Sequence, residues 1–365
     1  MNTTKGRLGE SLRIVWAITV KDITDGIKNR TTLAIILSVL FMMVFYRYMP
    51  DIFGSESLPR LVVHDAGSSS LLSELEGSTE FELRQALSQE GMERYVGDTH
   101  EGVLGLVIPA DFDHILASGS VIELEGYVVH WASDSDVGEV KAFFEQELSE
   151  RTGQPVRINV EGNVTYPDRD SVGRAFRASV SVVYAAVLVG MSLVPTLMIE
   201  EKRTHTIDAL LVSPASAGQI VIGKALTGLF YSVLASGVAL AFNLGLVTHW
   251  SLAVAAVVLG SLFTIGLGLL TGSVAGSMQT GKMMGLILML PLLLPPALLM
   301  ARGLFPESVL AVFDLVPTAA MAEVIRVAFS AGASLSDVGR EFALMGTSAA
   351  VVLAAVVYRI RRSDR

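Results

Sequence analysis

Six long apolar runs limit what this chain can fold into. They cover residues 31–46, 178–199, 220–248, 252–277, 283–300 and 342–358. A helix needs about 20 mostly apolar residues to cross a bilayer, and only helices or closed barrels satisfy their backbone hydrogen bonds in lipid. Charged residues make up 17% of the chain, whereas soluble domains contain about 25%. The sequence therefore predicts an α-helical polytopic membrane protein with six transmembrane helices.

The distribution of charge predicts how these helices are oriented. Residues 1–30, the segment 199–224, Lys282 and the tail 359–365 together hold 14 Lys or Arg against 7 Asp or Glu, a net charge of +7. The rest of the chain holds 13 against 29, a net charge of −16. Basic segments stay on the cytoplasmic side of a membrane. We therefore expect a multi-pass protein of a prokaryotic inner membrane, with both termini and the basic tail in the cytoplasm.

Residues 50–177 differ from the rest of the chain and contain no apolar run long enough to span a membrane. They hold 24 Asp or Glu against 9 Lys or Arg. Strand-like pieces rich in β-branched residues alternate with helical patterns. The strands are expected at 60–64, 103–108, 121–131 and 156–160, and the helices at 85–95, 110–117 and 138–151. This alternation predicts an extracytoplasmic α/β domain with its own core, inserted after a first transmembrane helix at 31–49.

The first 30 residues have the pattern of an amphipathic helix. Apolar residues recur every three or four positions from Leu8 to Ile27, and charged residues, Asp22 among them, fall on other faces. Such a helix is too polar to span and suits the inner membrane surface. We expect a cytosolic connecting helix over residues 1–30, with Trp16, Ile23 and Ile27 facing the membrane.

Prolines interrupt the region that holds transmembrane helices 2–6, at residues 178–358. Pro291, Pro295 and Pro296 lie within one apolar run, and prolines at membrane depth require neighbouring protein to satisfy the freed carbonyl groups. Residues 301–341 contain too many prolines and charges for one span. They are expected to form an outer re-entrant segment or surface helices.

A polar segment at residues 199–219 separates the second and third apolar runs. It begins with Glu200, Glu201, Lys202 and Arg203. Ile207, Leu210 and Leu211 follow at a spacing that places them on one face of a short helix, which Pro214 ends. Such a helix is suited to contact a partner in the water phase. The alternative is an ordinary charged loop between two membrane helices.

This segment resembles the loop between the second and third spans of ABC-2 type permeases. The resemblance rests on Glu201-Lys202-Arg203, Thr206, Leu210-Leu211, Ser213-Pro214 and Gly223-Lys224. In that family the loop forms a coupling helix that docks on a separate ATPase subunit. The resemblance implies that the residues coupling this chain to the ATPase are Glu200, Glu201, Lys202, Arg203, Thr206, Leu210, Leu211 and Pro214.

The same resemblance implies the assembly and the source of energy. Two permease subunits, identical or different, pair with two ABC ATPase subunits. ATP and magnesium bind to those partner subunits, and this chain binds no cofactor directly. The family exports drugs, lipids, peptides, polysaccharides or, in one branch with a similar outer insertion, sodium.

Motifs that suggest other chemistry are incomplete. Residues 218–225 have the spacing of a phosphate-binding loop, but Ala225 replaces the Ser or Thr that holds magnesium and the motif opens a membrane span. Lys224 is instead expected to reach lipid headgroups. The acidic run 134–139 lacks the third ligand position and the closing Glu of a calcium loop, the six histidines show no paired spacing, and the absence of cysteine excludes thiol chemistry. No catalytic or metal-binding residue is predicted, so the chain is expected to be a transport subunit, not an enzyme.

Two other functions fit a chain with these spans. One is an ion-coupled secondary transporter, and the other is a membrane-anchored sensor that acts through its outer domain. Ion-coupled carriers place ionisable residues inside their spans, whereas these runs hold no Asp or Glu well inside and Asn243 is their strongly polar residue. A sensor rarely needs five further spans. The composition favours a permease that moves an apolar or amphipathic substrate with energy from another subunit.

Overall fold

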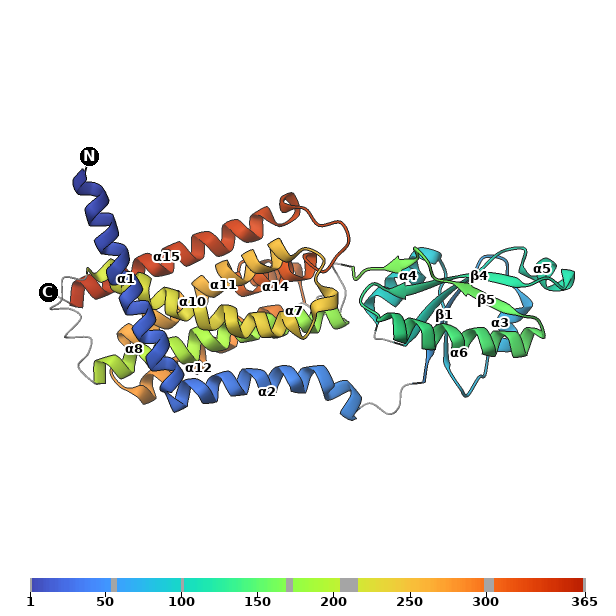
Figure 1. Cartoon of the computed structure of the whole chain (residues 1–365), viewed down its shortest axis with the longest axis horizontal. Coiled ribbons are helices and arrows are strands. Elements are labelled where there is room, and N and C mark those ends of the chain that lie inside the picture. Colours follow the sequence, from blue (N-terminus) through green and yellow to red (C-terminus); the bar gives the residue numbers. More distant parts are fainter. Residues whose placement is uncertain are drawn as a thin grey trace.

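The chain forms a bundle of long helices with a smaller sheet region at one end (Figure 1). The computed structural model describes residues 2–53, 58–99, 102–168, 173–203, 216–298 and 305–363. The N- and C-terminal ends of the chain lie together at the end of the bundle farthest from the sheet region (Figure 1). We call these two ends of the bundle the terminal end and the sheet end.

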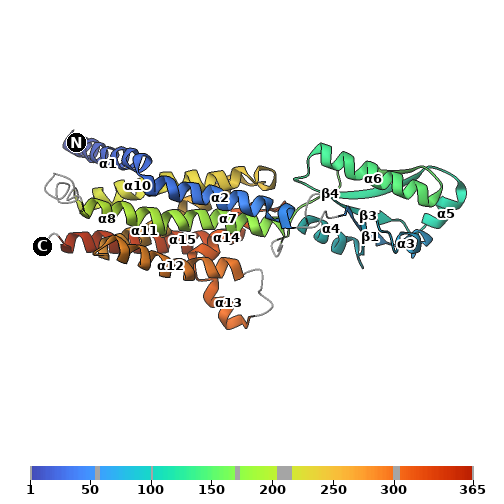
Figure 2. The same cartoon turned by 90° about the horizontal axis from the view of Figure 1, so that it is seen from below.

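Helix α1 crosses the terminal end, and the other helices of the bundle, except α13, run roughly parallel to one another (Figures 1 and 2). The elements are α1 (Asn2–Lys28), α2 (Arg30–Phe53), α7 (Arg174–Leu188), the π-helix η1 (Val189–Leu193), α8 (Val194–Arg203), α10 (Ala217–Ala241), α11 (Trp250–Val274), α12 (Met278–Leu298), α13 (Glu307–Phe313), α14 (Pro317–Val327) and α15 (Gly339–Ser363).

Among the described residues, five helical stretches are long and apolar enough to cross a membrane: Arg174–Glu200, Ala217–Ala241, Trp250–Val274, Met278–Leu298 and Leu335–Arg362. Helices α13 and α14 together are also apolar enough, but they are bent by 88° at their junction, and α13 projects from the side of the bundle (Figure 2). In α2, Thr32–Phe41 is a shorter apolar helix. The chain is therefore mostly helical, with five or six candidate spans.

The third apolar run ends its helix earlier than the sequence predicted. Helix α10 stops at Ala241, and a 3-10 turn at Leu244–Leu246 leads to α11. Leu246 and Val247 are apolar because they are buried in the protein, not because they continue a span. Asn243 consequently lies in the turn, where its side-chain amide donates to the carbonyl oxygen of Ala239 at 2.9 Å. The prediction that Asn243 lies inside a span was wrong.

The centre of the bundle is the stretch formed by α7, η1 and α8, most of which is buried. Small and hydroxylated side chains let neighbouring helices approach it closely. Thr264 on α11 donates to the carbonyl oxygen of Ala186 at 3.2 Å, and Ser232 and Ser261 share a hydrogen bond of 2.7 Å between α10 and α11. These polar groups lie in the interior, so their hydrogen bonds also fix how the helices are rotated.

Helix α12 continues through its prolines. Pro296 has no N–H for the carbonyl oxygen four residues earlier, which belongs to Leu292. The hydroxyl of Thr318 on α14 donates to that same oxygen, and Thr318 is fully buried. The expectation that neighbouring protein satisfies the carbonyl groups freed by prolines is confirmed at this position.

The sheet region lies between α2 and α7 in the chain and has six strands. They are β1 (Arg60–Asp65), β2 (Glu82–Gln85), β3 (Val103–Ile108), β4 (Ile122–Val129), β5 (Val156–Asn159) and β6 (Val164–Thr165). The order is β2-β1-β3-β4-β5, with β6 beside β4, and all neighbouring strands are parallel except β3 and β4. The four predicted strands are confirmed, and β2 and β6 were missed.

Alternation along the strands gives the sheet two apolar faces. Leu61 and Val63 of β1 pack with α3 (Ser70–Leu75), α5 (Phe112–Ser118) and α6 (Asp134–Thr152) on one face. Val62 points to the other face, which is covered by α4 (Gln89–Asp98). The sequence predicted α4 to begin at residue 85. It begins at Gln89 because Ser88 caps its first turn, accepting a hydrogen bond from the Gly91 N–H at 3.1 Å.

The sheet region contacts the bundle through His130 and Trp131, which follow β4. The His130 ring stacks on Tyr166 with centroids 4.5 Å apart, and its Nε2 atom lies 3.4 Å from the carbonyl oxygen of Leu246. Trp131 is buried against Gly245, where a Cβ would lie 3.1 Å from the Cβ of Trp131. We call these five residues the junction. His130 and Trp131 were predicted as strand and Gly245 and Leu246 as part of a span, while no element was predicted for Tyr166. Together these residues join the two parts of the chain.

Acid is expected to weaken the junction. Burial lowers the pKa of His130, partly offset by hydrogen bonds to backbone carbonyl groups, and Arg174 on α7 lowers it further. The Nε2 atom of His130 carries the proton, because it faces a carbonyl oxygen. The Nδ1 atom is buried and has no hydrogen-bond partner among the described residues. A histidine with a lowered pKa binds fewer protons when docked than when free, so docking weakens as the pH falls below about 6.5.

Hydrogen exchange measured at pH 7.5 and pH 5.0, after correction for intrinsic rates, would check this prediction. The amides of Thr165 and of Leu244–Leu246 should lose protection at the lower pH and regain it when the pH is restored. His130→Gln cannot titrate and should abolish the difference. Equal protection at both pH values in the unaltered protein would contradict the prediction.

Candidate functional site

Helix α1 is docked on α10 at the terminal end by a buried stripe of its residues. The stripe contains Val15, Ile18, Thr19, Asp22 and Gly26. It fits closely, since a Cβ at Gly223 of α10 would lie 3.0 Å from the Cβ of Ile18. A neighbouring side of α1 exposes a second apolar stripe, consisting of Leu12, Trp16, Val20 and Ile27, while Ile23 lies between the two stripes and is half-buried. The protein leaves Trp16 and Ile27 uncovered.

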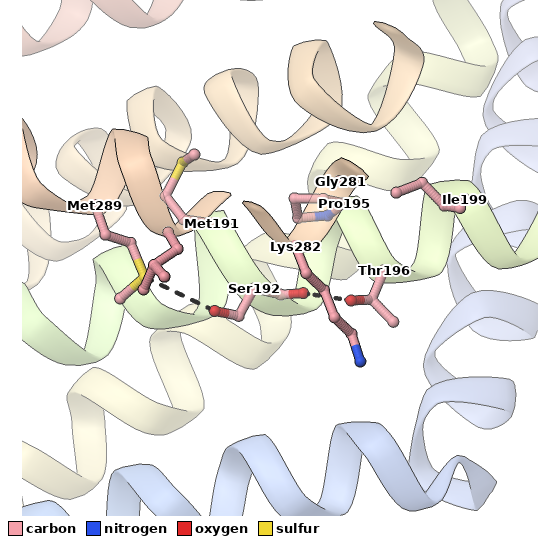
Figure 3. A pocket seen from close by; sticks show the side chains of 9 residues that line it. Met191, Ser192, Pro195, Thr196, Ile199, Gly281, Lys282 and Met289 are labelled. Atoms are coloured by element: carbon pink, nitrogen blue, oxygen red, sulfur yellow. Dashed lines mark hydrogen bonds between the residues drawn. The ribbon is translucent and has the colours of Figure 1, made fainter. Parts of the chain in front are cut away.

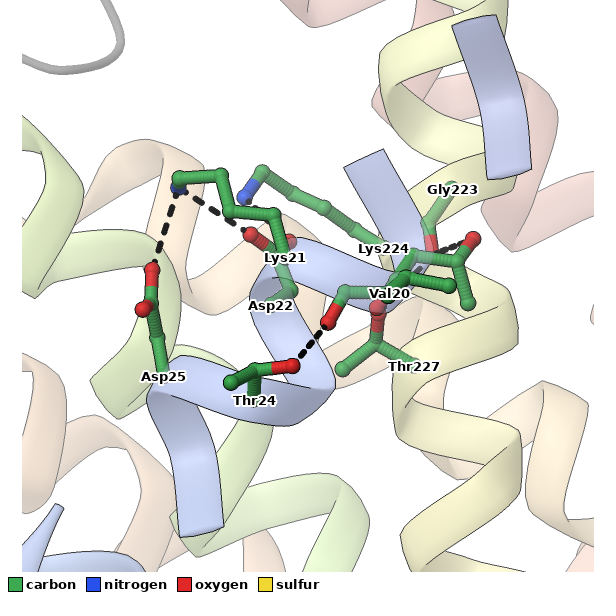
Figure 4. Close-up of polar contacts among 9 residues, drawn as sticks. Val20, Lys21, Asp22, Thr24, Asp25, Gly223, Lys224 and Thr227 are labelled. Atoms are coloured by element: carbon green, nitrogen blue, oxygen red, sulfur yellow. Dashed lines mark hydrogen bonds and ion pairs between the residues drawn. The ribbon is translucent and has the colours of Figure 1, made fainter. Parts of the chain in front are cut away.

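A buried ion pair lies at the centre of this contact (Figure 4). Lys224 Nζ on α10 lies 3.2 Å from Asp22 Oδ2 on α1, and both side chains are about as buried as core residues, at 5% and 6% exposure. The sequence predicted that Asp22 lies on a polar face and that Lys224 reaches lipid headgroups. Both predictions were wrong. Helical periodicity shows which residues share a face, but it does not show which face packs against protein. An unpaired buried charge is costly, so the carboxylate and the ammonium group are buried together.

Hydrogen bonds surround the ion pair. Thr19 Oγ1 donates to the carbonyl oxygen of Gly223 at 3.2 Å, and Thr227 Oγ1 donates to the carbonyl oxygen of Thr19 at 3.4 Å. The Tyr231 hydroxyl donates to the carbonyl oxygen of Ile23 at 2.7 Å. These bonds join α1 to α10 over about two turns of α10. They fix both the rotation and the register of α1.

The stretch of α1 from Ser11 onward contacts the residues on either side of segment 204–215. At one end of this stretch, the side-chain amide of Gln219 on α10 donates to the hydroxyl of Ser11 at 2.7 Å, and Gln219 also forms a capping box with Ser216. At the other end, the side-chain amide of Asn29, just after α1, donates to the carboxylate of Glu200 on α8. Helix α1 therefore bridges the last turn of α8 and the first turn of α10.

The residues predicted to couple this chain to an ATPase are described only in part. Glu200, Glu201, Lys202 and Arg203 form the last turn of α8, where Glu200 is half-buried and Arg203 is exposed. Thr206, Leu210, Leu211 and Pro214 lie outside the described residues, and so does the helix predicted for them. The structure places the start of the predicted segment beside α1, which the sequence did not indicate.

A cavity of about 350 Å³ opens between α12 and the stretch formed by η1 and α8 (Figure 3). It is lined by Met191, Ser192, Pro195, Thr196, Ile199, Gly281, Lys282, Leu286 and Met289. The π-helix η1 contributes Met191 and Ser192, and single π-turns in membrane and soluble helices are frequent at functional sites. Thr196 donates to the carbonyl oxygen of Ser192 at 2.6 Å, and the Ser192 hydroxyl lies 3.9 Å from the sulfur of Met289.

Glycines on α12 bring its backbone close to the central helix at this cavity. A Cβ at Gly285 would lie 2.5 Å from the carbonyl oxygen of Met191, and a Cβ at Gly281 would overlap Ile199. The cavity was not predicted from the sequence. The available signal was the spacing of Gly281 and Gly285 on one helical face, because small residues four apart permit close helix contact in membranes.

Comparison with known proteins identifies relatives of this chain. The profile of the ABC-2 family transporter proteins matches residues 31–358, a range that contains the sheet region and all the helices after α1. A protein described as a probable multidrug ABC transporter permease, YbhR of Escherichia coli strain K12, is 23% identical over 295 residues, covering 77% of this chain and 80% of its own length. The protein of the same name from Escherichia coli O157:H7 matches equally. No solved structure matches.

Proposed function

This chain belongs to the ABC-2 family of transporter proteins, and we propose that it is the transmembrane permease subunit of an ATP-driven exporter. The observation that carries the proposal is the family match, which extends over nearly all of the helical bundle. The chain contributes the translocation path. Two ABC ATPase subunits and a second permease subunit, identical or different, complete the transporter, with ATP and magnesium bound to the ATPase subunits.

Residues 199–214 form the contact with the ATPase in this proposal. Their first part, Glu200–Arg203, lies at the terminal end of the bundle. Helix α10 starts there with a capping box, in which Ser216 and Gln219 satisfy each other's backbone N–H groups. The segment is therefore held at two fixed points, an arrangement suited to pass movement of a partner into α8 and α10.

The cavity between α8 and α12 is the candidate for the start of the substrate path. Its lining combines methionines and leucine with two hydroxyl groups and Lys282. Methionine side chains adapt to ligands of different shape. This lining favours an amphipathic substrate with a large apolar part, and the relative from Escherichia coli is described as a probable multidrug permease.

We further propose six spans, with α2 as the first and with α13 and α14 as an outer re-entrant pair. The sheet region is then extracytoplasmic and the termini are cytoplasmic, in agreement with net charges of −16 and +7 on the two sets of segments. Cysteines introduced at Ser69 and Ser135 should react with an impermeant maleimide on intact cells. The chain has no cysteine of its own, so absence of labelling there would reject this orientation.

Purification with the partner tests the proposed function. The tagged chain, expressed in its own host, should retain an ABC ATPase identified by mass spectrometry. The complex in liposomes should move an amphipathic dye only when ATP is present on the ATPase side. Dye movement driven by an ion gradient without any ATPase would instead support the secondary transporter, and the absence of any transport would favour the sensor.

A further inference from the structure

Helix α1 spans the distance between the two fixed points of segment 199–214. Its contact with Gln219 is at Ser11 and its contact with Glu200 is at Asn29. These 18 residues of helix correspond to about 27 Å at 1.5 Å per residue. A force that moves one end of the segment therefore reaches the other end through α1 as well as through the segment itself.

The ion pair of Asp22 and Lys224 lies between these two contacts. A pair of apolar residues of similar size would hold two helices together at least as well, because burying charges is costly. Unlike an apolar contact, a charge pair defines one register of α1 on α10. If α1 slid by one turn, the two charges would be separated inside the protein. The contact therefore resists sliding more than ordinary packing does.

Asp22 has a second cation within reach. Lys21 Nζ lies 3.3 Å from Asp22 Oδ1, and it also lies 3.6 Å from Asp25 Oδ2 on the exposed side of α1 (Figure 4). The carboxylate of Asp22 therefore bridges one lysine on its own helix and one on α10. A small cavity of about 10 Å³, bordered by Asp22, Lys224, Thr227 and Met198, adjoins the pair on the side of α8. Among the described residues, this pair is thus at the meeting point of α1, α8 and α10.

We propose that Asp22 and Lys224 are positioning residues for coupling between the ATPase and the spans. They hold α1 in one register on α10, so that α1, the end of α8 and the start of α10 move as a single unit. The inference rests on the proposed function, because it assigns the pair a role in passing movement from the ATPase. It assigns no contact with ATP or substrate to either residue.

The central test compares single and paired substitutions in the full complex. Asp22→Asn should lower the number of substrate molecules moved per ATP hydrolysed by about tenfold, while the ATPase still co-purifies. The exchanged pair, Asp22→Lys with Lys224→Asp, should restore most of this ratio. Asp25→Asn is the matched control, because Asp25 lies on the same helix, is 61% exposed and contacts Lys21 but not α10. It should leave the ratio unchanged.

A disulfide supplies a rescue that a merely stabilising role would not predict. Cysteines at Ile18 and Gly223 can be joined after a small separation of the two helices, because a Cβ at residue 223 would lie 3.0 Å from that of Ile18, slightly closer than the distance of about 3.5–4.5 Å between the Cβ atoms of a disulfide. In the Asp22→Asn background, the oxidised protein should recover coupling and the reduced protein should not. An unchanged ratio in Asp22→Asn, or no difference between oxidised and reduced forms, would overturn the proposal.

The failure of the proposed function would look different. In that case no variant, the unaltered chain included, would move substrate with ATP. The yield of the disulfide between residues 18 and 223 can be measured on the chain alone. It therefore still tests whether Asp22 and Lys224 hold α1 in register. Asp22→Asn should lower that yield, the exchanged pair should restore it, and Asp25→Asn should not affect it. Equal yields in all variants would reject the positioning role.

Discussion

Replacement of Gly268 by alanine is expected to prevent the helical bundle from assembling. Gly268 of α11 lies against the π-helix η1, and a Cβ at this position would overlap the carbonyl oxygen of Gly190. The obstacle is backbone in the most buried stretch of the bundle, so no side chain can rotate away. Overpacking a core by one methylene costs about 1–3 kcal/mol, and a collision with backbone is expected to cost more. Little monodisperse protein should be obtained after extraction in mild detergent.

Gly237→Ala is the matched control for Gly268→Ala. Gly237 lies within α10, but nothing except its own helix is found within 4 Å of the position of its Cβ. Alanine should raise the stability of this helix by about 0.5–1 kcal/mol, because glycine loses more backbone entropy on folding. The two variants differ only in what surrounds the added methyl group. A similar yield and melting temperature for both would show that the contact between Gly268 and Gly190 is not as close as described.

Patterns that depend on local sequence predicted much of this fold. Apolar runs of about 20 residues identify candidate spans because the thickness of a bilayer sets helix length. Strands β1, β3, β4 and β5 were found because alternation and β-branched residues are local signals. Strand β2 was missed because its residues, from Glu82 to Gln85, are polar except for Leu83 and mostly exposed. Its position in the sheet comes from pairing with β1, which is a tertiary effect.

The features that depend on contacts between distant residues could not be predicted in the same way. Helical periodicity placed Asp22 away from the apolar stripe, but it could not reveal that Lys224, about 200 positions later, would cover it. Residues 189–193 have no composition that marks a π-helix, so the cavity that η1 helps to line was not predicted. His130 and Trp131 continued a strand pattern, and their role in the junction depends on the turn at Gly245 and Leu246.

The segment predicted to contact the ATPase remains a prediction from the sequence and the family resemblance. The structure adds one constraint, because the last turn of α8 and the capped start of α10 fix where the segment begins and ends. Residues 204–215 must therefore connect two points that α1 also joins. A short helix between those points would present Leu210 and Leu211 on the same face as Ile207, because residues three and four positions apart are neighbours on a helical surface.

Replacing Leu210 and Leu211 together by aspartate is expected to release the ATPase from the membrane subunit. A helix that docks in a groove is held by a few apolar anchors, and charges at the rim affect mainly the association rate. Each leucine side chain contributes about 1.5–3 kcal/mol when fully buried, so loss of both corresponds to about a hundredfold weaker binding or more. Co-purification of the ATPase and ATP-driven transport should be lost together, while the membrane-inserted chain is made in normal amounts.

The substitution Leu58→Asp with Leu87→Asp is the control for this variant. It makes the same chemical change twice on exposed leucines at the other end of the molecule, in the sheet region. A general effect of two added charges on insertion or stability would impair both double variants, whereas a docking role impairs only Leu210→Asp with Leu211→Asp. If that variant still binds the ATPase and exports normally, the segment is an ordinary connection between two spans. The contact with the ATPase would then be sought on other elements at the terminal end, first on α1, which crosses that end.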